Sequence, residues 1–256
     1  MVVLLPSRSS HCLCSLYDRS TTIWLMKNDS ALTVACVNSA LLEQQFIAMS
    51  PFNAPRFATQ TGIQRFPRPE LELYILRDFL SGYECTGLIE RIDAQRRPST
   101  IADDMGYEAY RTSETCDLDG NDPFIAAIDA KLAAVSGLSA AHGEPLQGQR
   151  YAVGQEFKAH TDYFEPNGRD YDQYCSRSGN RTWTLMVYLN EPRDGGATRF
   201  IEVDKTFKPD KGKLVAWNNR LPDGGVNHAT LHHGMKVRSG TKYIITKWYR
   251  ELPWTG

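Results

Sequence analysis

The sequence has no long hydrophobic run: no stretch of its 256 residues approaches the roughly 20 consecutive apolar residues that a membrane-spanning helix needs. The apolar start, Met1–Leu5, is interrupted by Pro6 and is too short to predict a secretory signal. An excess of positive charge is also missing, because 29 Lys and Arg stand against 30 Asp and Glu. Proteins that bind the phosphate backbone carry a basic surplus. We therefore expect neither a membrane partner nor a nucleic-acid partner.

Paired cysteine motifs are missing as well. The six cysteines are Cys12, Cys14, Cys36, Cys85, Cys116 and Cys175. None of their spacings gives the C-x-x-C pattern of zinc and redox sites. We expect free thiols, which are typical of a reducing, cytoplasmic location.

Residues 1–62 differ in composition from the rest of the chain. Charge is sparse there, Ser, Thr, Ala and Asn are frequent, and no hydrophobic period persists. Ala31–Ala48 carries a partial apolar stripe at helical spacing, which predicts a helix. We expect residues 1–62 to be an extension and residues 63–256 to form the functional domain.

Two helices are predicted early in the second region. Ser81 and Glu84 form a capping box, after which apolar residues recur at helical spacing. Asp122 and Pro123 suit the N-cap and first position of another helix, and Gly137 suits its end.

Short strands make up most of the second region. Period-two patterns and turn residues predict strands near 71–79, 147–153, 182–190, 198–203, 212–217, 226–231 and 242–249. Over 182–190, Trp183, Leu185 and Val187 fall on one face, and Thr184 and Met186 on the other. Helices followed by many short strands predict an α+β, mainly β fold, in which the helices pack on a sandwich or barrel.

A candidate metal site centres on His160-Thr161-Asp162. On a strand, residues i and i+2 share a face, so the imidazole and the carboxylate are able to hold one metal ion. The third ligand is His228, His232 or His233. Two histidines and one carboxylate leave open positions on iron(II), which suits oxygenase chemistry.

A buried cation is the second requirement, because an organic-acid cosubstrate needs a partner for its carboxylate. A lysine on the inner face of a strand is costly unless an anion pairs with it. If the face of Lys242 and Thr246 is the inner one, Lys242 is that cation. If the other face is inward, the cation is Lys247.

Several motifs recur in a fixed order across the second region. They are R-T-S at 111–113, Tyr151 with G-Q at 154–155, H-T-D at 160–162, R-T-W-T-L-M-V-Y-L-N at 181–190, G-G-A-T at 195–198, and the block 232–248. With these motifs, the chain from about Pro69 to Glu251 resembles the prolyl 4-hydroxylase family of Fe(II)- and 2-oxoglutarate-dependent dioxygenases. That family places its second metal histidine ten residues before the lysine that binds 2-oxoglutarate, which selects His232 together with Lys242.

The resemblance implies a double-stranded β-helix, or jelly-roll, core. The implied iron ligands are His160, Asp162 and His232. Lys242 is implied to bind the distal carboxylate of 2-oxoglutarate, assisted by the hydroxyls of Tyr151 and Thr184. The implied reaction uses O2, converts 2-oxoglutarate to succinate and CO2, and hydroxylates a C–H bond, with ascorbate keeping the iron reduced.

The implied substrate is a proline in a peptide or protein, contacted by Arg111, Arg181 and Trp248. Phe157 departs from the family pattern, which often has a substrate-binding tyrosine at that place. This departure leaves open a free amino acid, a small molecule or another residue type as substrate. A non-catalytic jelly-roll binding module is a third reading, but such a module usually lacks a ligand or the lysine, and this sequence retains both.

Overall fold

The computed structural model describes residues 3–7, 10–18, 21–28, 31–38, 56–99 and 111–256. The chain divides into two compact units, residues 1–53 and residues 54–256. Phe57 is fully buried in the core of the second unit, which therefore begins before residue 63. No helix in these described ranges is long and apolar enough to cross a membrane.

The first unit is an antiparallel sheet whose four strands follow one another in chain order. They are β1 (Val3–Ser7), β2 (Ser10–Asp18), β3 (Thr21–Asn28) and β4 (Ala31–Asn38). The helix predicted from residue 31 is therefore wrong over residues 31–38, where β4 pairs with β3 along its whole length. The β-branched residues Thr33, Val34 and Val37 favour this outcome. Residues 39–48 lie outside the described part of the chain.

The second unit contains an eight-stranded sheet with the order β5-β6-β15-β11-β18-β9-β8-β7. In that order the strands are Gln64–Arg65, Leu73–Leu76, Leu214–Asn218, Arg181–Tyr188, Lys242–Arg250, Gln147–Tyr151, Glu114–Asp117 and Arg97–Pro98. A smaller sheet has the order β10-β16-β13-β14, with strands Phe157–His160, His232–Gly234, Thr198–Phe200 and Lys205–Phe207. A two-stranded ribbon joins β12 (Asp194–Gly195) and β17 (Val237–Ser239). This mainly β arrangement with few helices is the expected jelly-roll.

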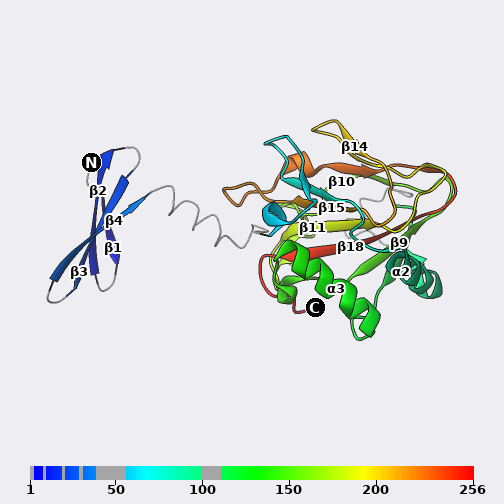
Figure 1. The fold of residues 1–256 in the computed structure, drawn as a ribbon, viewed down its shortest axis with the longest axis horizontal. Coiled ribbons are helices and arrows are strands. Elements are labelled where there is room, and N and C mark those ends of the chain that lie inside the picture. The colour runs from blue at the N-terminus through cyan, green and yellow to red at the C-terminus, as the bar shows by residue number, and fades with distance from the viewer. Residues whose placement is uncertain (1–2, 8–9, 19–20, 29–30, 39–55, 100–110) are drawn as a thin grey trace. The chain divides into compact units, whose positions relative to one another are not determined.

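Helix α2 begins where the sequence predicts, and α3 both begins and ends where it predicts. In α2 (Gly82–Gln95), the Ser81 hydroxyl accepts from the Glu84 N–H and the Glu84 carboxylate accepts from the Ser81 N–H. In α3 (Pro123–Ser136), Asp122 accepts from the N–H of Phe124, and the helix ends at Gly137 in the left-handed conformation. A third helix, α4 (Tyr171–Cys175), is a single short turn. Helices α2 and α3 lie on one side of the large sheet and β10 lies on the other (Figure 1).

Strand β11 separates two apolar clusters as its alternation predicts. Trp183, Leu185 and Val187 pack in the cluster that contains the buried faces of α2 and α3. Met186 and Tyr188 pack in the other cluster, between the large and small sheets. The face of β11 that carries Met186 therefore packs toward the small sheet and the candidate site.

One predicted strand is absent from the described region. Residues 226–231 contain a 3-10 helix, η3 (His228–Thr230), and the strand β16 starts only at His232. The cause is local, because the Asn227 side chain accepts from the N–H of Ala229 and caps the turn. Further 3-10 turns are η1 (Phe57–Thr59) and η2 (Ala140–His142).

Candidate active site

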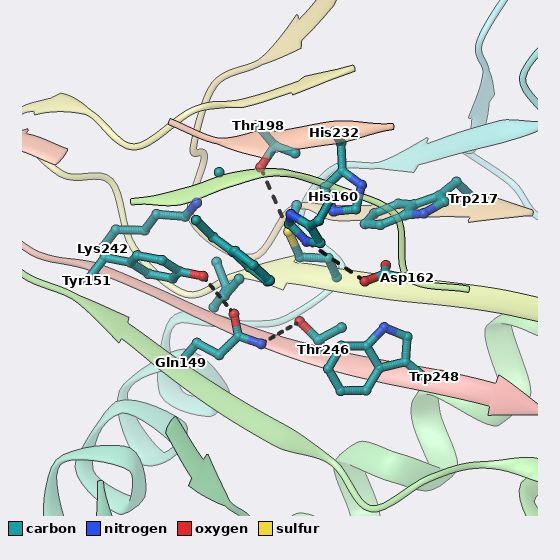
Figure 2. Close-up of a pocket in the computed structure, with 14 residues that line it drawn as sticks. Gln149, Tyr151, His160, Asp162, Thr198, Trp217, His232, Lys242, Thr246 and Trp248 are labelled. Carbon is teal, nitrogen blue, oxygen red and sulfur yellow. Dashed lines mark hydrogen bonds and ion pairs between the residues drawn. The ribbon is translucent and has the colours of Figure 1, made fainter. Parts of the chain in front are cut away.

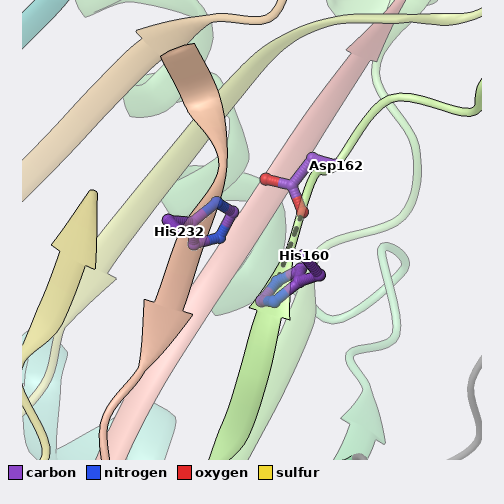
Figure 3. Close-up of side chains that lie close together, drawn as sticks. All are labelled: His160, Asp162 and His232. Atoms are coloured by element: carbon purple, nitrogen blue, oxygen red, sulfur yellow. Dashed lines mark ion pairs between the residues drawn. The ribbon is translucent and has the colours of Figure 1, made fainter. Parts of the chain in front are cut away.

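Three potential metal ligands meet where the small sheet faces the large one. His160 and His232 stand opposite each other in the β10–β16 pair, with ring centroids 4.2 Å apart. Asp162 lies two residues past the end of β10. One ligand atom from each of the three residues lies within 4.8 Å of the others (Figure 3). This is the set that the resemblance implied.

The other two candidate histidines are engaged elsewhere. His228 is exposed in η3, and its Nδ1 lies 2.9 Å from the hydroxyl of Tyr163. His233 is next to His232 on a strand, so it points to the opposite face, where its Nε2 lies 3.0 Å from a carboxylate oxygen of Glu156. Strand alternation therefore directs the side chain of His232, and not that of His233, toward His160.

Both ligand histidines are held in the tautomer that binds metal. Nδ1 of His160 lies 2.7 Å from the backbone oxygen of Lys158, and Nδ1 of His232 lies 2.9 Å from that of Thr230. A carbonyl only accepts, so Nδ1 carries the proton and Nε2 presents its lone pair. Burial lowers the pKa of both imidazoles, which keeps them neutral and able to coordinate. Two neutral imidazoles and one carboxylate fit iron(II).

Thr184 lies on the inner face as predicted, but its hydroxyl contacts a metal ligand. It donates to Oδ2 of Asp162 at 2.7 Å and accepts from the side-chain amide of Asn219 at 3.0 Å. Thr184 is not among the residues that line the cavity beside the metal ligands. The threonines that do line it are Thr198 and Thr246.

The two alternative lysines are both buried, on opposite faces of β18. Lys247 forms an ion pair with Asp129 of α3 at 2.7 Å. Lys242 is 1% exposed and faces the cavity, and no carboxylate pairs with it in the part of the chain that the structure describes. Burial lowers the pKa of Lys242 to about 7. Of the two candidate lysines, Lys242 is therefore the one with no carboxylate partner among the described residues.

The cavity extends from Lys242 to the metal ligands (Figure 2). Tyr151 pairs with Lys242 across the β9–β18 ladder, and the lysine Nζ lies 4.9 Å from the centre of the tyrosine ring. The Tyr151 hydroxyl donates to Oε1 of Gln149 at 2.9 Å. Tyr151 thus lies where a ligand of Lys242 would contact it.

The three predicted substrate contacts have different surroundings. Trp248 lines the cavity, and the Arg181 guanidinium lies 3.9 Å from the centre of its ring. Arg181 also makes a two-point ion pair with the buried Glu144, at 2.6 and 2.9 Å. Arg111 lies 4.9 Å from the ring centre of Phe157 and donates to Thr115. Trp248 and Phe157 therefore border the cavity, while the Arg181 guanidinium lies against the Trp248 ring.

Glu144 was not anticipated from the sequence. Burial alone would raise the pKa of its carboxyl, but the guanidiniums of Arg181 and Arg250 lower it below the ordinary value. Glu144 and Asn219 lie outside the regular strands, so no periodicity predicts their contacts. Gln149 and Thr246 also line the cavity. Strand alternation placed Thr246 on the face of Lys242, and the same pattern could have found Gln149, which shares a face with Tyr151.

Comparison with known proteins agrees with this geometry. Residues 146–250 match the 2OG-Fe(II) oxygenase superfamily. The chain is 32% identical over 143 residues to prolyl 4-hydroxylase subunit alpha-1 of Gallus gallus, covering 56% of this chain but 28% of that protein. It is 28% identical over 199 residues to probable prolyl 4-hydroxylase 9 of Arabidopsis thaliana, covering 68% of this chain and 67% of that protein. The chain thus spans under a third of the chicken subunit.

A solved structure is similar over most of its length. It is the viral collagen prolyl hydroxylase from Paramecium Bursaria Chlorella virus-1 in its 2-oxoglutarate complex, with a TM-score of 0.56 and 28% identity, covering 70% of this chain and 95% of that one. The fold and the three ligands define a 2OG-Fe(II) oxygenase. Within that superfamily, the chain is similar to the prolyl 4-hydroxylases. Proteins of that superfamily use Fe(II) and 2-oxoglutarate, and His160, Asp162 and His232 are the residues that would hold the iron here.

Proposed function

We propose that the protein hydroxylates a proline in a peptide or protein, using O2 and converting 2-oxoglutarate to succinate and CO2. The observation that carries this proposal is the complete catalytic set. The three potential iron ligands border the same cavity as Lys242, which has no carboxylate partner among the described residues. The similar proteins are prolyl hydroxylases by name. Ascorbate is typical of the family as the reductant that restores Fe(II). The balance of charge supports a peptide over a nucleic acid.

Each residue has a defined part in this proposal. Bound Fe(II) supplies the centre at which 2-oxoglutarate and O2 react. The Lys242 ammonium pairs with the distal carboxylate of 2-oxoglutarate, which removes the cost of burying an uncompensated charge. The Tyr151 hydroxyl, which already donates to Gln149, is placed to bond the same end of the cosubstrate. Trp248 lines the cavity beside Asp162, where it would border the substrate.

Phe157 supports a second candidate, in which the same chemistry acts on a free amino acid, a small molecule or a residue other than proline. Its ring stacks on the ligand His160 with centroids 3.5 Å apart. A phenyl ring offers no hydroxyl to a peptide carbonyl. The wall beside the iron is therefore more apolar than a tyrosine would make it.

Peptide profiling tests the proposal. The iron-loaded protein is incubated with 2-oxoglutarate, ascorbate and a panel of proline-rich peptides, each matched by a copy with the prolines changed to alanine. We expect one added oxygen on a proline, located by fragmentation in a mass spectrometer, in the original peptides alone. Succinate formation without peptide oxidation across the panel would favour the second candidate.

The pH dependence of cosubstrate binding is set by Lys242. Burial lowers its pKa to about 7, so it is protonated below that pH and neutral above it. Since 2-oxoglutarate binds the protonated form, Lys242 must take up a proton for binding above pH 7. This proton uptake weakens the free energy of binding by about 1.4 kcal/mol for each pH unit above 7. We expect the apparent Kd to be level below pH 7 and to rise about tenfold per unit above it. Anaerobic calorimetry on the iron-loaded protein measures this.

The control is Lys242→Arg, because a guanidinium stays charged throughout this range. This variant should bind more weakly, since its side chain is larger, but without the rise above pH 7. A level Kd from about pH 6 to 9 in the unmodified protein would contradict the assignment of Lys242 as the anchor.

A further inference from the structure

Two buried polar side chains form a hydrogen-bonded chain to one iron ligand. Asn219 Nδ2 lies 3.0 Å from Thr184 Oγ1, which lies 2.7 Å from Asp162 Oδ2. Asn219 and Thr184 have no exposed surface, and Asp162 is 7% exposed. They come from neighbouring strands of the large sheet: Thr184 is in β11, and Asn219 directly follows β15.

The direction of these hydrogen bonds is fixed by the carboxylate. An ionised Asp162 can only accept, so the single Thr184 hydrogen points to Oδ2. The Thr184 oxygen is then left as an acceptor, and Asn219 must present its N–H to it. This orients the Asn219 amide, whose Oδ1 has no partner among the described residues.

The two carboxylate oxygens of Asp162 have different contacts. Oδ2 is held by the Thr184 hydroxyl, while Oδ1 lies 4.0 Å from Nε2 of His160, on the side of the metal ligands. The Asp162 backbone is held separately, because Arg181 donates to its carbonyl at 3.3 Å. Without the Thr184 hydroxyl, the carboxylate would be free to rotate about its last bond.

We propose that Thr184 and Asn219 are positioning residues that orient the Asp162 carboxylate to hold the iron. The inference rests on the iron site of the proposed function and is independent of which substrate is hydroxylated. Partners that orient a metal ligand typically contribute 10- to 100-fold to metal affinity.

Thr184→Val is the direct test, because valine keeps the shape of threonine and removes the hydroxyl. We expect Fe(II) affinity, measured anaerobically by equilibrium dialysis, to fall about 10- to 100-fold. Thr184→Ser restores the hydroxyl and should recover most of that affinity. The matched control is Thr182→Val on the same strand, where the buried hydroxyl donates to the Tyr249 carbonyl at 3.1 Å and touches no metal ligand. This control should lose stability but not Fe(II) affinity.

A double-mutant cycle tests the role of Asn219. Asn219→Ala removes the amide that orients the hydroxyl, so it should weaken Fe(II) binding less than Thr184→Val does. The double variant should match Thr184→Val within about twofold, because Asn219 acts through Thr184 alone. Unchanged affinity in Thr184→Val, an equal loss in Thr182→Val, or additive losses in the cycle would each overturn the inference. The Fe(II) affinities are all measured by dialysis, so a failure of peptide hydroxylation leaves them interpretable.

Discussion

Asp162→Ala is expected to abolish iron-dependent turnover of 2-oxoglutarate. Asp162 is the only one of the three ligands that carries negative charge, and the variant leaves two neutral imidazoles to hold the ion. The loss should exceed about 100-fold, the upper range for residues that merely orient a ligand. Succinate release with saturating Fe(II) and 2-oxoglutarate measures it.

A surface variant separates this effect from a general loss of negative charge. Glu202 is an exposed carboxylate outside the cavity, so Glu202→Ala should retain turnover close to that of the unmodified protein. Thermal unfolding of Asp162→Ala shows whether the fold is kept. Turnover in a folded Asp162→Ala protein at the level of the Glu202 variant would exclude Asp162 as an iron ligand.

Lys242→Ala has the second largest expected effect. In the proposed complex, the Lys242 ammonium and the cosubstrate carboxylate form a buried ion pair. Removing one partner of a buried pair costs about 3–5 kcal/mol, since the other charge is left uncompensated. We expect KM for 2-oxoglutarate to rise roughly 100- to 4,000-fold, measured by succinate formation over a wide cosubstrate range.

Strand β18 supplies a matched control for this prediction. Lys247 is equally buried, but it lies on the opposite face and pairs with Asp129 of α3. Lys247→Ala should lower the free energy of unfolding by breaking that pair, while KM for 2-oxoglutarate stays near the original value. Comparable KM values for the two alanine variants would mean that Lys242 does not anchor the cosubstrate.

The position of Thr184 was predicted from a local pattern, but its contact with Asp162 was not. Alternation along 182–190 correctly placed Thr184 on the inner face of the sheet. Its partner was set by the loop after β10, which brings Asp162 within 2.7 Å of the hydroxyl. A pattern within one strand specifies a face, but it carries no information on which distant segment packs there.

The sequence by itself determined the features that depend on neighbours along the chain. These are the helix ends at Ser81, Asp122 and Gly137 and the alternation of β11. Each arises from hydrogen bonds or side-chain directions within a few residues, so the local sequence is sufficient. The family resemblance then selected His232 and Lys242 by spacing.

The tertiary structure alone decided which side chains meet. Register between β10 and β16 sets His160 against His232. Helix α3 supplies the carboxylate that pairs with Lys247, whereas Lys242 has no carboxylate partner in the part of the chain that the structure describes. The same long-range packing gave Asp162 its partner Thr184. These contacts join residues far apart in the chain, and their energies depend on burial and mutual distance, which exist only once the sheets have packed together.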